Sequence, residues 1–265
     1  MAGFTLGPAL LFCPADRPDR FAKALERADA VILDLEDAVA PENRAAAREA
    51  IAAADLDPAR VIVRVNEVGS SDWDADLAAA ARYGTIMVPK ADRGLLDAMP
   101  AGFEVVALCE SAAGVVAAPE LATRVSALMW GAEDLVASLG GTSSRHAEGT
   151  YRDVARTARA SVLLAAGAAG IPAIDTVHLD IDDLDGLRAE AEDAAASGFS
   201  ATACIHPSHV AVIREAYAPT AEQVAWATRV LDAAAGEEGV FRFEGGMVDG
   251  PVLRHAAAVV RRSLR

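Results

Sequence analysis

The chain has 265 residues, of which 53% are hydrophobic and 24% are charged, and its formal net charge is −15. This length suffices for one large domain or two small ones whose cores need no disulfide or structural metal. The excess of acidic residues argues against a nucleic-acid-binding protein and against binding to anionic membranes, because proteins of both kinds use a surplus of Lys and Arg.

Short apolar runs recur along the chain and predict eight strands. The runs are nearly continuous rather than alternating, as in parallel strands that are covered on both faces. They lie at 9–14, 30–37, 61–66, 85–90, 104–111, 126–134, 173–180 and 201–207. Three of them contain the cysteines, Cys13, Cys109 and Cys204, which form no CxxC pair. We expect these thiols to be reduced and buried.

Ala-rich stretches with helical spacing separate these runs, at 20–28, 43–54, 76–84, 116–125, 152–170 and 185–198. Gly84, Gly170 and Gly198 stand where helix C-caps are expected. Eight strand–helix units in roughly 215 residues are typical of a (β/α)8 TIM barrel. A doubly wound sheet is the alternative, but the first turn reads CPADRPDRF and no GxGxxG or GxxxxGK[ST] motif occurs. We therefore predict an α/β fold with a barrel over residues 8–217.

The remaining residues, 218–265, form a C-terminal extension. We predict a helix over 219–234 that begins after an N-cap at Thr220, with Gln223 at the capping-box position. A short hairpin, FRFEGGMV, and a helix that begins at Pro251 follow. Because a barrel closes without such a segment, we expect the extension to pack on the barrel mouth or on a neighbouring subunit.

The N-terminal sequence lacks the basic segment of a signal peptide, and its apolar run is short. No stretch approaches the roughly 20 apolar residues of a membrane span. We therefore expect a cytoplasmic protein with no membrane partner.

Polar residues gather where the predicted strands end, which is where barrel enzymes carry their active sites. They are Glu36, Asp37, Arg64, Asn66, Lys90, Glu110, Glu133, Asp134 and His206. Several carboxylates around one barrel mouth repel each other unless a cation lies among them, and hard oxygen ligands suit Mg²⁺ or Mn²⁺. Arg64 offers a planar fork for a substrate carboxylate. A metal beside an arginine predicts a site for a 2-oxo acid or a 3-hydroxy acid.

Each of these residues also has a structural interpretation. Asp134 could cap the helix that follows it, and Glu36 and Asp37 could bind loop amides. Lys90 fits a salt bridge better than a Schiff-base nucleophile. His206, which precedes a proline, could be a hydrogen-bonded residue of the rim.

The strand ends and their flanks match a known family. The segments LFCPADRPDRFAKA, VILDLEDAV, VIVRVN, MVPK, ALCES, MWGAEDL, CIHPSH and FEGGMVDGPVL occur in this order between Pro8 and Arg262. They strongly resemble the citrate lyase β-subunit-like proteins of the HpcH/HpaI aldolase and malyl-CoA lyase superfamily, and are most similar to mycobacterial CitE-like proteins. The pairing of LDLEDAV with GAEDL is specific, and the family's (β/α)8 barrel agrees with the predicted fold.

The resemblance implies a magnesium site. Glu110 and Asp134 match the family's Mg²⁺ ligands, and Glu110 thereby also contacts substrate. Arg64 matches the arginine that grips the carboxylate of the oxo acid. Asp37 and Glu36 match groups that hold metal-bound waters.

The resemblance also implies contacts outside the metal site. Residues that match coenzyme A or substrate contacts of related lyases are Phe12, Arg20, Lys23, Ile205 and His206. Asp249 matches an aspartate that the C-terminal extension brings to a neighbour's active site, where we expect it to act as the acid/base. This role implies a homo-oligomer, and the resemblance implies a trimer or a hexamer.

The implied reaction is the reversible, Mg²⁺-dependent cleavage of a 3-hydroxy-3-carboxyacyl-CoA, such as citramalyl-CoA or malyl-CoA. Its products are acetyl-CoA and a 2-oxo acid. Three alternatives remain: an acyl-CoA thioesterase, a citrate lyase β subunit that depends on an acyl carrier protein, and a metal-free Schiff-base aldolase that uses Lys90.

Overall fold

The computed structural model describes residues 6–236 and 239–263, which fall into two compact units, Met1–Ile213 and Arg214–Arg265. Helix α9 (His209–Tyr217) spans the boundary between them. No helix in the described part of the chain is both long and apolar enough to cross a membrane.

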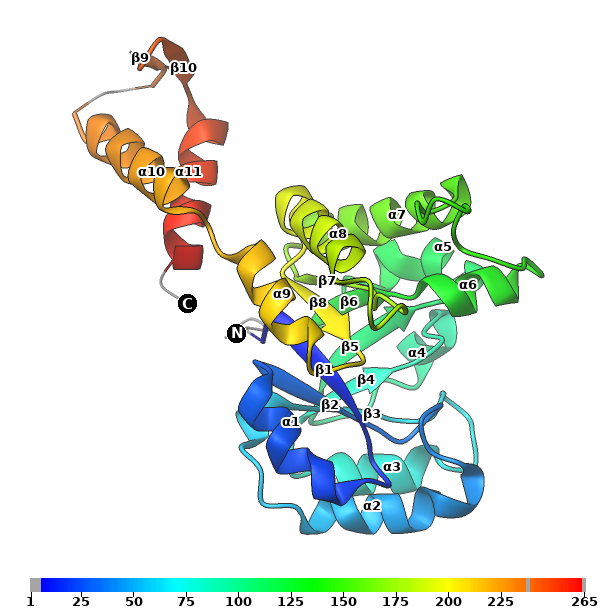
Figure 1. Cartoon of the computed structure of the whole chain (residues 1–265). Helices are drawn as coiled ribbons and strands as arrows, with labels where there is room; N and C mark the ends of the chain where they lie inside the picture. The colour runs from blue at the N-terminus through cyan, green and yellow to red at the C-terminus, as the bar shows by residue number, and fades with distance from the viewer. Residues whose placement is uncertain (1–5, 237–238, 264–265) are drawn as a thin grey trace. The chain divides into compact units, whose positions relative to one another are not determined.

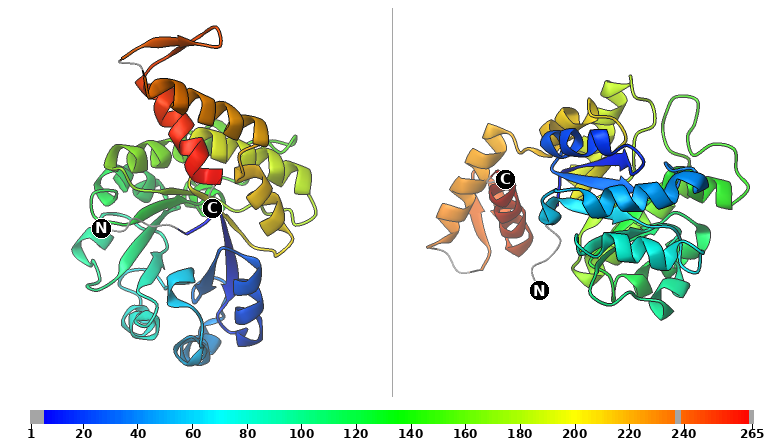
Figure 2. Two further views of the ribbon diagram at one scale, coloured as in Figure 1. Left: turned by 90° about the vertical axis from the view of Figure 1, so that its left-hand side faces the viewer. Right: turned by 90° about the horizontal axis from the view of Figure 1, so that it is seen from below.

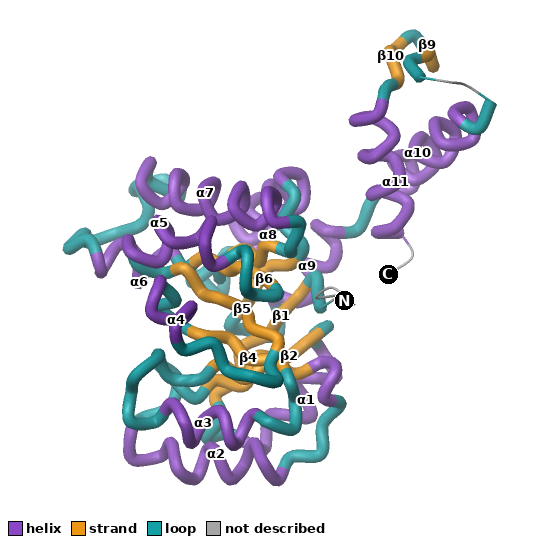
Figure 3. The backbone as a smooth tube through the Cα atoms, turned by 180° about the vertical axis from the view of Figure 1, so that it is seen from behind, coloured by secondary structure: helices purple, strands orange, loops and turns teal. Residues whose placement is uncertain are grey.

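The first unit is a closed barrel of eight parallel strands, in the order in which they occur along the chain. The strands lie inside a ring of helices (Figures 1 and 3). They are β1 (Ala9–Pro14), β2 (Ala30–Asp34), β3 (Val61–Arg64), β4 (Thr85–Val88), β5 (Glu104–Cys109), β6 (Ala127–Trp130), β7 (Ala173–Asp175) and β8 (Ala201–Cys204). Strand β1 pairs with both β2 and β8, which closes the barrel. The predicted (β/α)8 fold is confirmed.

Apolar side chains fill the barrel interior. Those of Leu10, Ile32, Ile62, Val106 and Leu108 belong to this core and are almost fully buried. All five residues of β2 are buried, as are all four of β3, because each strand has the core on one face and helices on the other. The three cysteines form no disulfide and are buried, as predicted.

The helices of the barrel unit are α1 (Phe21–Arg27), α2 (Arg44–Ala53), α3 (Trp73–Ala80), α4 (Arg93–Asp97), α5 (Ala112–Leu121), α6 (Ala132–Ser138), α7 (Asp153–Ala169) and α8 (Leu184–Ser197). Three 3-10 turns also occur, η1 (Pro18–Arg20), η2 (Pro41–Asn43) and η3 (Pro58–Arg60). Figure 2 shows the helices on the outside of the barrel from two further sides. Gly170 and Gly198 cap α7 and α8 in the left-handed conformation. Gly84 also has a positive φ, but it follows a turn, since α3 ends at Ala80.

Several strands are shorter than the apolar runs predict. Strand β2 ends at Asp34 rather than at residue 37, and β7 ends at Asp175 rather than at residue 180. The run at 126–134 divides into β6 and the start of α6. The segments beyond the last strand pairs are therefore loops at the carboxyl ends of the strands, and these loops carry the polar residues.

The second unit contains α10 (Ala221–Ala234), a hairpin of β9 (Phe241–Phe243) and β10 (Gly246–Val248), and α11 (Gly250–Ser263). The predicted capping box is present: the Gln223 amide donates to the Thr220 hydroxyl at 3.1 Å, and the Thr220 amide donates to the Gln223 side chain at 2.9 Å. Ala227, Val230 and Val259 belong to the small core between the two helices.

Candidate active site

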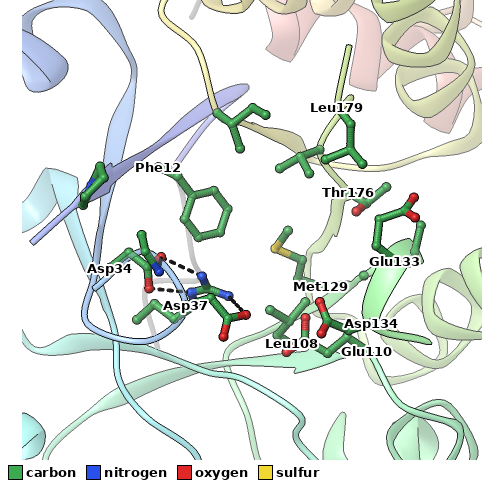
Figure 4. A pocket seen from close by; sticks show the side chains of 17 residues that line it. Phe12, Asp34, Asp37, Leu108, Glu110, Met129, Glu133, Asp134, Thr176 and Leu179 are labelled. Atoms are coloured by element: carbon green, nitrogen blue, oxygen red, sulfur yellow. Dashed lines mark hydrogen bonds and ion pairs between the residues drawn. The ribbon is translucent and has the colours of Figure 1, made fainter. Parts of the chain in front are cut away.

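A cavity of about 430 Å³ lies at the carboxyl ends of the barrel strands (Figure 4). Seven of its lining residues were predicted for the site: Phe12, Asp37, Arg64, Glu110, Glu133, Asp134 and Ile205. The wall also includes Asp34 and apolar side chains of Leu108, Met129, Val177 and Leu179. The cavity therefore combines charged groups with an apolar wall.

Arg64, the last residue of β3, is held by carboxylates of the neighbouring strand β2 and of the loop that follows it. Asp34 is its partner in the β2–β3 register, so the two side chains share a face. Asp34 accepts hydrogen bonds from Nε and Nη2 of Arg64, at 2.7 and 2.6 Å. Oε2 of Glu36 lies 2.8 Å from Nη1, and the guanidinium lies over the Phe12 ring, 5.0 Å from its centroid. Burial alone would lower the pKa of Arg64, but Asp34 raises it above its usual value.

Asp34 is a site residue that the sequence prediction missed. Besides Arg64, it accepts the backbone N–H groups of Glu36, at 3.0 Å, and Ala38, at 3.2 Å. It thereby fixes the loop that carries Glu36 and Asp37. The signal was an acidic residue inside an otherwise apolar run.

Lys90 contacts both acidic groups that flank it. Its φ is +48°, which is unfavourable for a residue with a side chain and costs on the order of 1–3 kcal/mol. Its backbone N–H donates to Oε1 of Glu110 at 2.9 Å, and its ammonium donates to Oε1 of Glu36. Burial alone would lower the pKa of Lys90, but the hydrogen bond to Glu36 and the nearby carboxylates raise it. A Schiff-base nucleophile needs a neutral amine, so this environment disfavours that role.

Glu110 follows β5 and is buried. Burial, together with the charges of Asp134 and Glu36, raises its pKa from 4.5 to about 8. Figure 4 shows the carboxylates of Glu110 and Asp134 near each other at one side of the cavity. Gly131 leaves the space that Glu110 occupies, because a Cβ at this glycine would lie 2.7 Å from Cβ of Glu110 and 3.0 Å from its Oε2.

This arrangement fits a divalent cation. Within the described residues, no ion pair involves Glu110 or Asp134, and no three His, Cys, Asp or Glu side chains form a metal-binding group. Mg²⁺ typically takes one or two carboxylates and completes its shell with water and substrate oxygens. Two carboxylates, one of them with a raised pKa, match that requirement, since a bound cation favours the ionised form of Glu110 that burial and the neighbouring carboxylates disfavour.

The remaining predicted residues, Glu36 among them, lie outside the cavity wall. Arg20 and Lys23 are exposed, at the end of η1 and on α1. His206 is exposed, and the Ser208 hydroxyl lies 2.6 Å from its Nδ1. Asp249 belongs to the second unit, where its Oδ1 accepts the N–H of Val252 in the first turn of α11.

Comparison with known proteins gives concordant matches. The family described as HpcH/HpaI aldolase/citrate lyase matches residues 9–95 and 98–207. A citrate lyase subunit beta-like protein of Mycobacterium tuberculosis is 54% identical over 261 residues, which cover 97% of this chain and 96% of that protein. A mitochondrial citramalyl-CoA lyase of Rattus norvegicus is 30% identical over 290 residues, which cover 95% of this chain and 84% of the lyase.

A solved structure matches over nearly the whole chain. It is a crystal structure of the CitE protein of Mycobacterium tuberculosis in complex with magnesium, acetoacetate and coenzyme A. Its TM-score is 0.91 and its sequence identity is 53%, with 99% of this chain and 100% of that chain covered.

Proposed function

The chain belongs to the HpcH/HpaI aldolase/citrate lyase family, as its motifs predicted, and on this premise we propose that it cleaves a 3-hydroxy-3-carboxyacyl-CoA to acetyl-CoA and a 2-oxo acid, reversibly and with Mg²⁺. Citramalyl-CoA and malyl-CoA are the substrate types. One observation carries the proposal: the cavity holds an arginine fork on one side and two carboxylates without a cationic partner among the described residues on the other.

Glu110 and Asp134 are the residues that would hold Mg²⁺, or Mn²⁺ in its place, and Asp37 and Glu36 would hold its waters. When bound, the ion supplies a Lewis acid that stabilises negative charge on the substrate oxygens. The Mycobacterium tuberculosis structure, which is a complex with magnesium, acetoacetate and coenzyme A, supports Mg²⁺ as the metal.

Arg64 would orient the carboxylate of the oxo acid. Asp34 takes two of the five guanidinium N–H groups and Glu36 faces a third on Nη1, which leaves one N–H on Nη1 and one on Nη2 for a ligand. Leu108 and Met129 in the cavity wall would contact the apolar part of the same ligand. Holding one end of the substrate in this way positions the carbon–carbon bond that breaks.

A proton must move in each direction of the reaction. In cleavage, the substrate hydroxyl loses a proton, the carbon–carbon bond breaks, and the enolate of acetyl-CoA gains a proton at its methyl carbon. We assign that proton transfer to Asp249, delivered by the C-terminal extension (218–265) of another copy in a homo-oligomer, a trimer or hexamer. Phe12, Arg20, Lys23, Ile205 and His206 would contact coenzyme A or substrate.

The proposal is tested by turnover with the purified chain alone. Citramalyl-CoA and malyl-CoA are supplied with Mg²⁺ or with excess EDTA, and the products are separated by chromatography. Release of acetyl-CoA that depends on Mg²⁺ is the expected result. Free CoA without acetyl-CoA would show a thioesterase instead, and no turnover would favour a subunit that needs an acyl carrier protein.

The role of Asp249 needs its own experiment. Asp249→Ala should abolish turnover and leave Mg²⁺ binding unchanged. Loss of Mg²⁺ binding together with turnover would show that the residue is structural.

A further inference from the structure

Four side chains of alternating charge follow one another across the ends of β2, β3 and β4. Asp34 pairs with Arg64, Arg64 pairs with Glu36, and Glu36 pairs with Lys90. The first three are nearly buried, whereas the side chain of Lys90 is 38% exposed. Lys90 therefore stands at the solvent end of this charge row.

Without the ammonium group, the row would carry a net negative charge. Arg64 would then face three carboxylates, Asp34 at 2.6 Å, Glu36 at 2.8 Å and Asp37 at 4.0 Å, with its own positive charge to balance them. Charges at such distances interact strongly where water is largely excluded. An incoming carboxylate would meet this excess of negative charge as well as the acidic pair Glu110 and Asp134.

We infer that Lys90 is a positioning residue for the oxo acid: by pairing with Glu36, it leaves Arg64 attractive to the carboxylate of the substrate. The inference rests on the proposed function, because it presupposes an anionic ligand at Arg64. Lys90 does not contact the reacting atoms in this role. It acts through Glu36 and through the charge balance of the row.

The backbone of Lys90 has a separate effect that substitution does not remove. Its N–H holds Glu110, and every residue except proline supplies the same N–H. Methionine and arginine would also share the strain of the positive φ at this position. Side-chain variants of Lys90 therefore test its charge while the Glu110 contact persists.

The two sides of the cavity should respond in opposite directions. Removing a positive charge near Glu110 should leave Mg²⁺ binding unchanged or strengthen it, because the cation loses a repelling neighbour. Removing the same charge should weaken the binding of an oxo acid. A general disruption of the site would weaken both.

The experiment is calorimetric titration of the full chain, first with Mg²⁺ alone and then, at saturating Mg²⁺, with pyruvate, glyoxylate or oxaloacetate. The variants are Lys90→Met and Lys90→Arg. Arg82→Met is the matched control, since it removes one positive charge from an exposed ion pair with Asp55. For Lys90→Met we expect oxo-acid Kd to rise about tenfold or more and Mg²⁺ Kd not to rise. Lys90→Arg should recover most of the loss, and Arg82→Met should bind as the wild type does.

Three results would overturn the inference. Lys90→Met could bind the oxo acid as tightly as the wild type, or Lys90→Arg could fail to recover binding, or Mg²⁺ and oxo-acid affinity could fall together. In each of these cases the wild type still binds and the proposed function stands. If the wild type binds none of the three oxo acids, the proposed function fails and the inference fails with it.

Discussion

The two sides of the cavity contain the same acidic residue types but balance their charges differently. On the side formed by β2, β3 and β4, Asp34 and Glu36 are paired with Arg64 and Lys90. On the side formed by β5 and α6, Glu110 accepts one backbone N–H, and no ion pair involves it in the described part of the chain.

The difference separates two uses of buried charge. A buried carboxylate with a cation and hydrogen bonds is part of the folded scaffold, and removing its partner is costly. A buried carboxylate without a cation is unfavourable when ionised, which is why the pKa of Glu110 is about 8. The ionised form of such a carboxylate is stabilised only when a bound ligand supplies a positive charge.

The largest expected effect is on the paired side, the side formed by β2, β3 and β4, where Arg64 and Lys90 balance the carboxylates. Arg64→Met leaves Asp34 and Glu36 buried without their shared cation, so we expect a loss of about 3–5 kcal/mol in the free energy of unfolding. Turnover should fall by at least about 10³-fold, because the substrate carboxylate loses its fork. Urea unfolding and steady-state kinetics measure the two effects. The exposed pair gives the control, since Arg82→Met should cost less than about 1 kcal/mol. Equal stability of Arg64→Met and wild type would refute the comparison.

On the unpaired side, which contains Glu110, removing a charge should stabilise the folded chain rather than destabilise it. Between pH 4.5 and about 8, folded Glu110 keeps a proton that the unfolded chain has released, so its contribution to stability falls as pH rises through this window. Glu110→Gln stays neutral and can still accept the N–H of Lys90. In EDTA at pH 8.5 we expect this variant to melt a few degrees above the wild type, although it lacks turnover. Near pH 4.5 the two should melt alike, and a variant that melts lower at pH 8.5 would contradict the argument.

Mg²⁺ binding should also depend on the protonation of Glu110. Below pH 8 the ion must displace the proton of Glu110, so the apparent affinity should rise with pH, by up to about tenfold per unit, and level off above pH 8. Calorimetry in two buffers of different ionisation enthalpy counts the protons released. We expect about one proton at pH 6.5 and close to none at pH 9. An affinity that does not change with pH would show that Glu110 is already ionised before the metal binds.

The barrel could be predicted from the sequence because its strands are long apolar runs at regular intervals. Helix α4 could not, since its five residues are too few for a periodic pattern, and the start of α6 at Ala132 was predicted as strand. The sequence analysis extended several strands too far at their carboxyl ends, because the loop residues that follow these strands are partly apolar. Pairing with the next strand, which the sequence does not show, decides where each strand ends.

The candidate site was predictable where a single residue carries the signal. Arg64 ends β3, Glu110 directly follows β5, Asp134 lies in the first turn of α6, and all three line the cavity. Asp34 was missed because its role depends on pairing with a residue 30 positions away, which arises only when β2 and β3 align. Lys90 has a positive φ, and its N–H donates to Glu110. A single lysine in the sequence gives no indication of this backbone conformation.

The smallest expected effect tests the space around Glu110 and not its charge. A Cβ at Gly131 would lie 2.7 Å from Cβ of Glu110, so Gly131→Ala must displace that side chain or the backbone beside it. We expect a loss of about 1 kcal/mol in the free energy of unfolding and a Mg²⁺ affinity about tenfold weaker, because overpacking shifts the carboxylate. Gly167→Ala on α7 is the matched control: nothing lies within 4 Å of the added Cβ, so this helix substitution should stabilise by about 0.5–1 kcal/mol and leave Mg²⁺ binding unchanged. If Gly131→Ala binds Mg²⁺ as tightly as the control does, the position of Glu110 is not set by this close contact, and its raised pKa alone distinguishes the unpaired side.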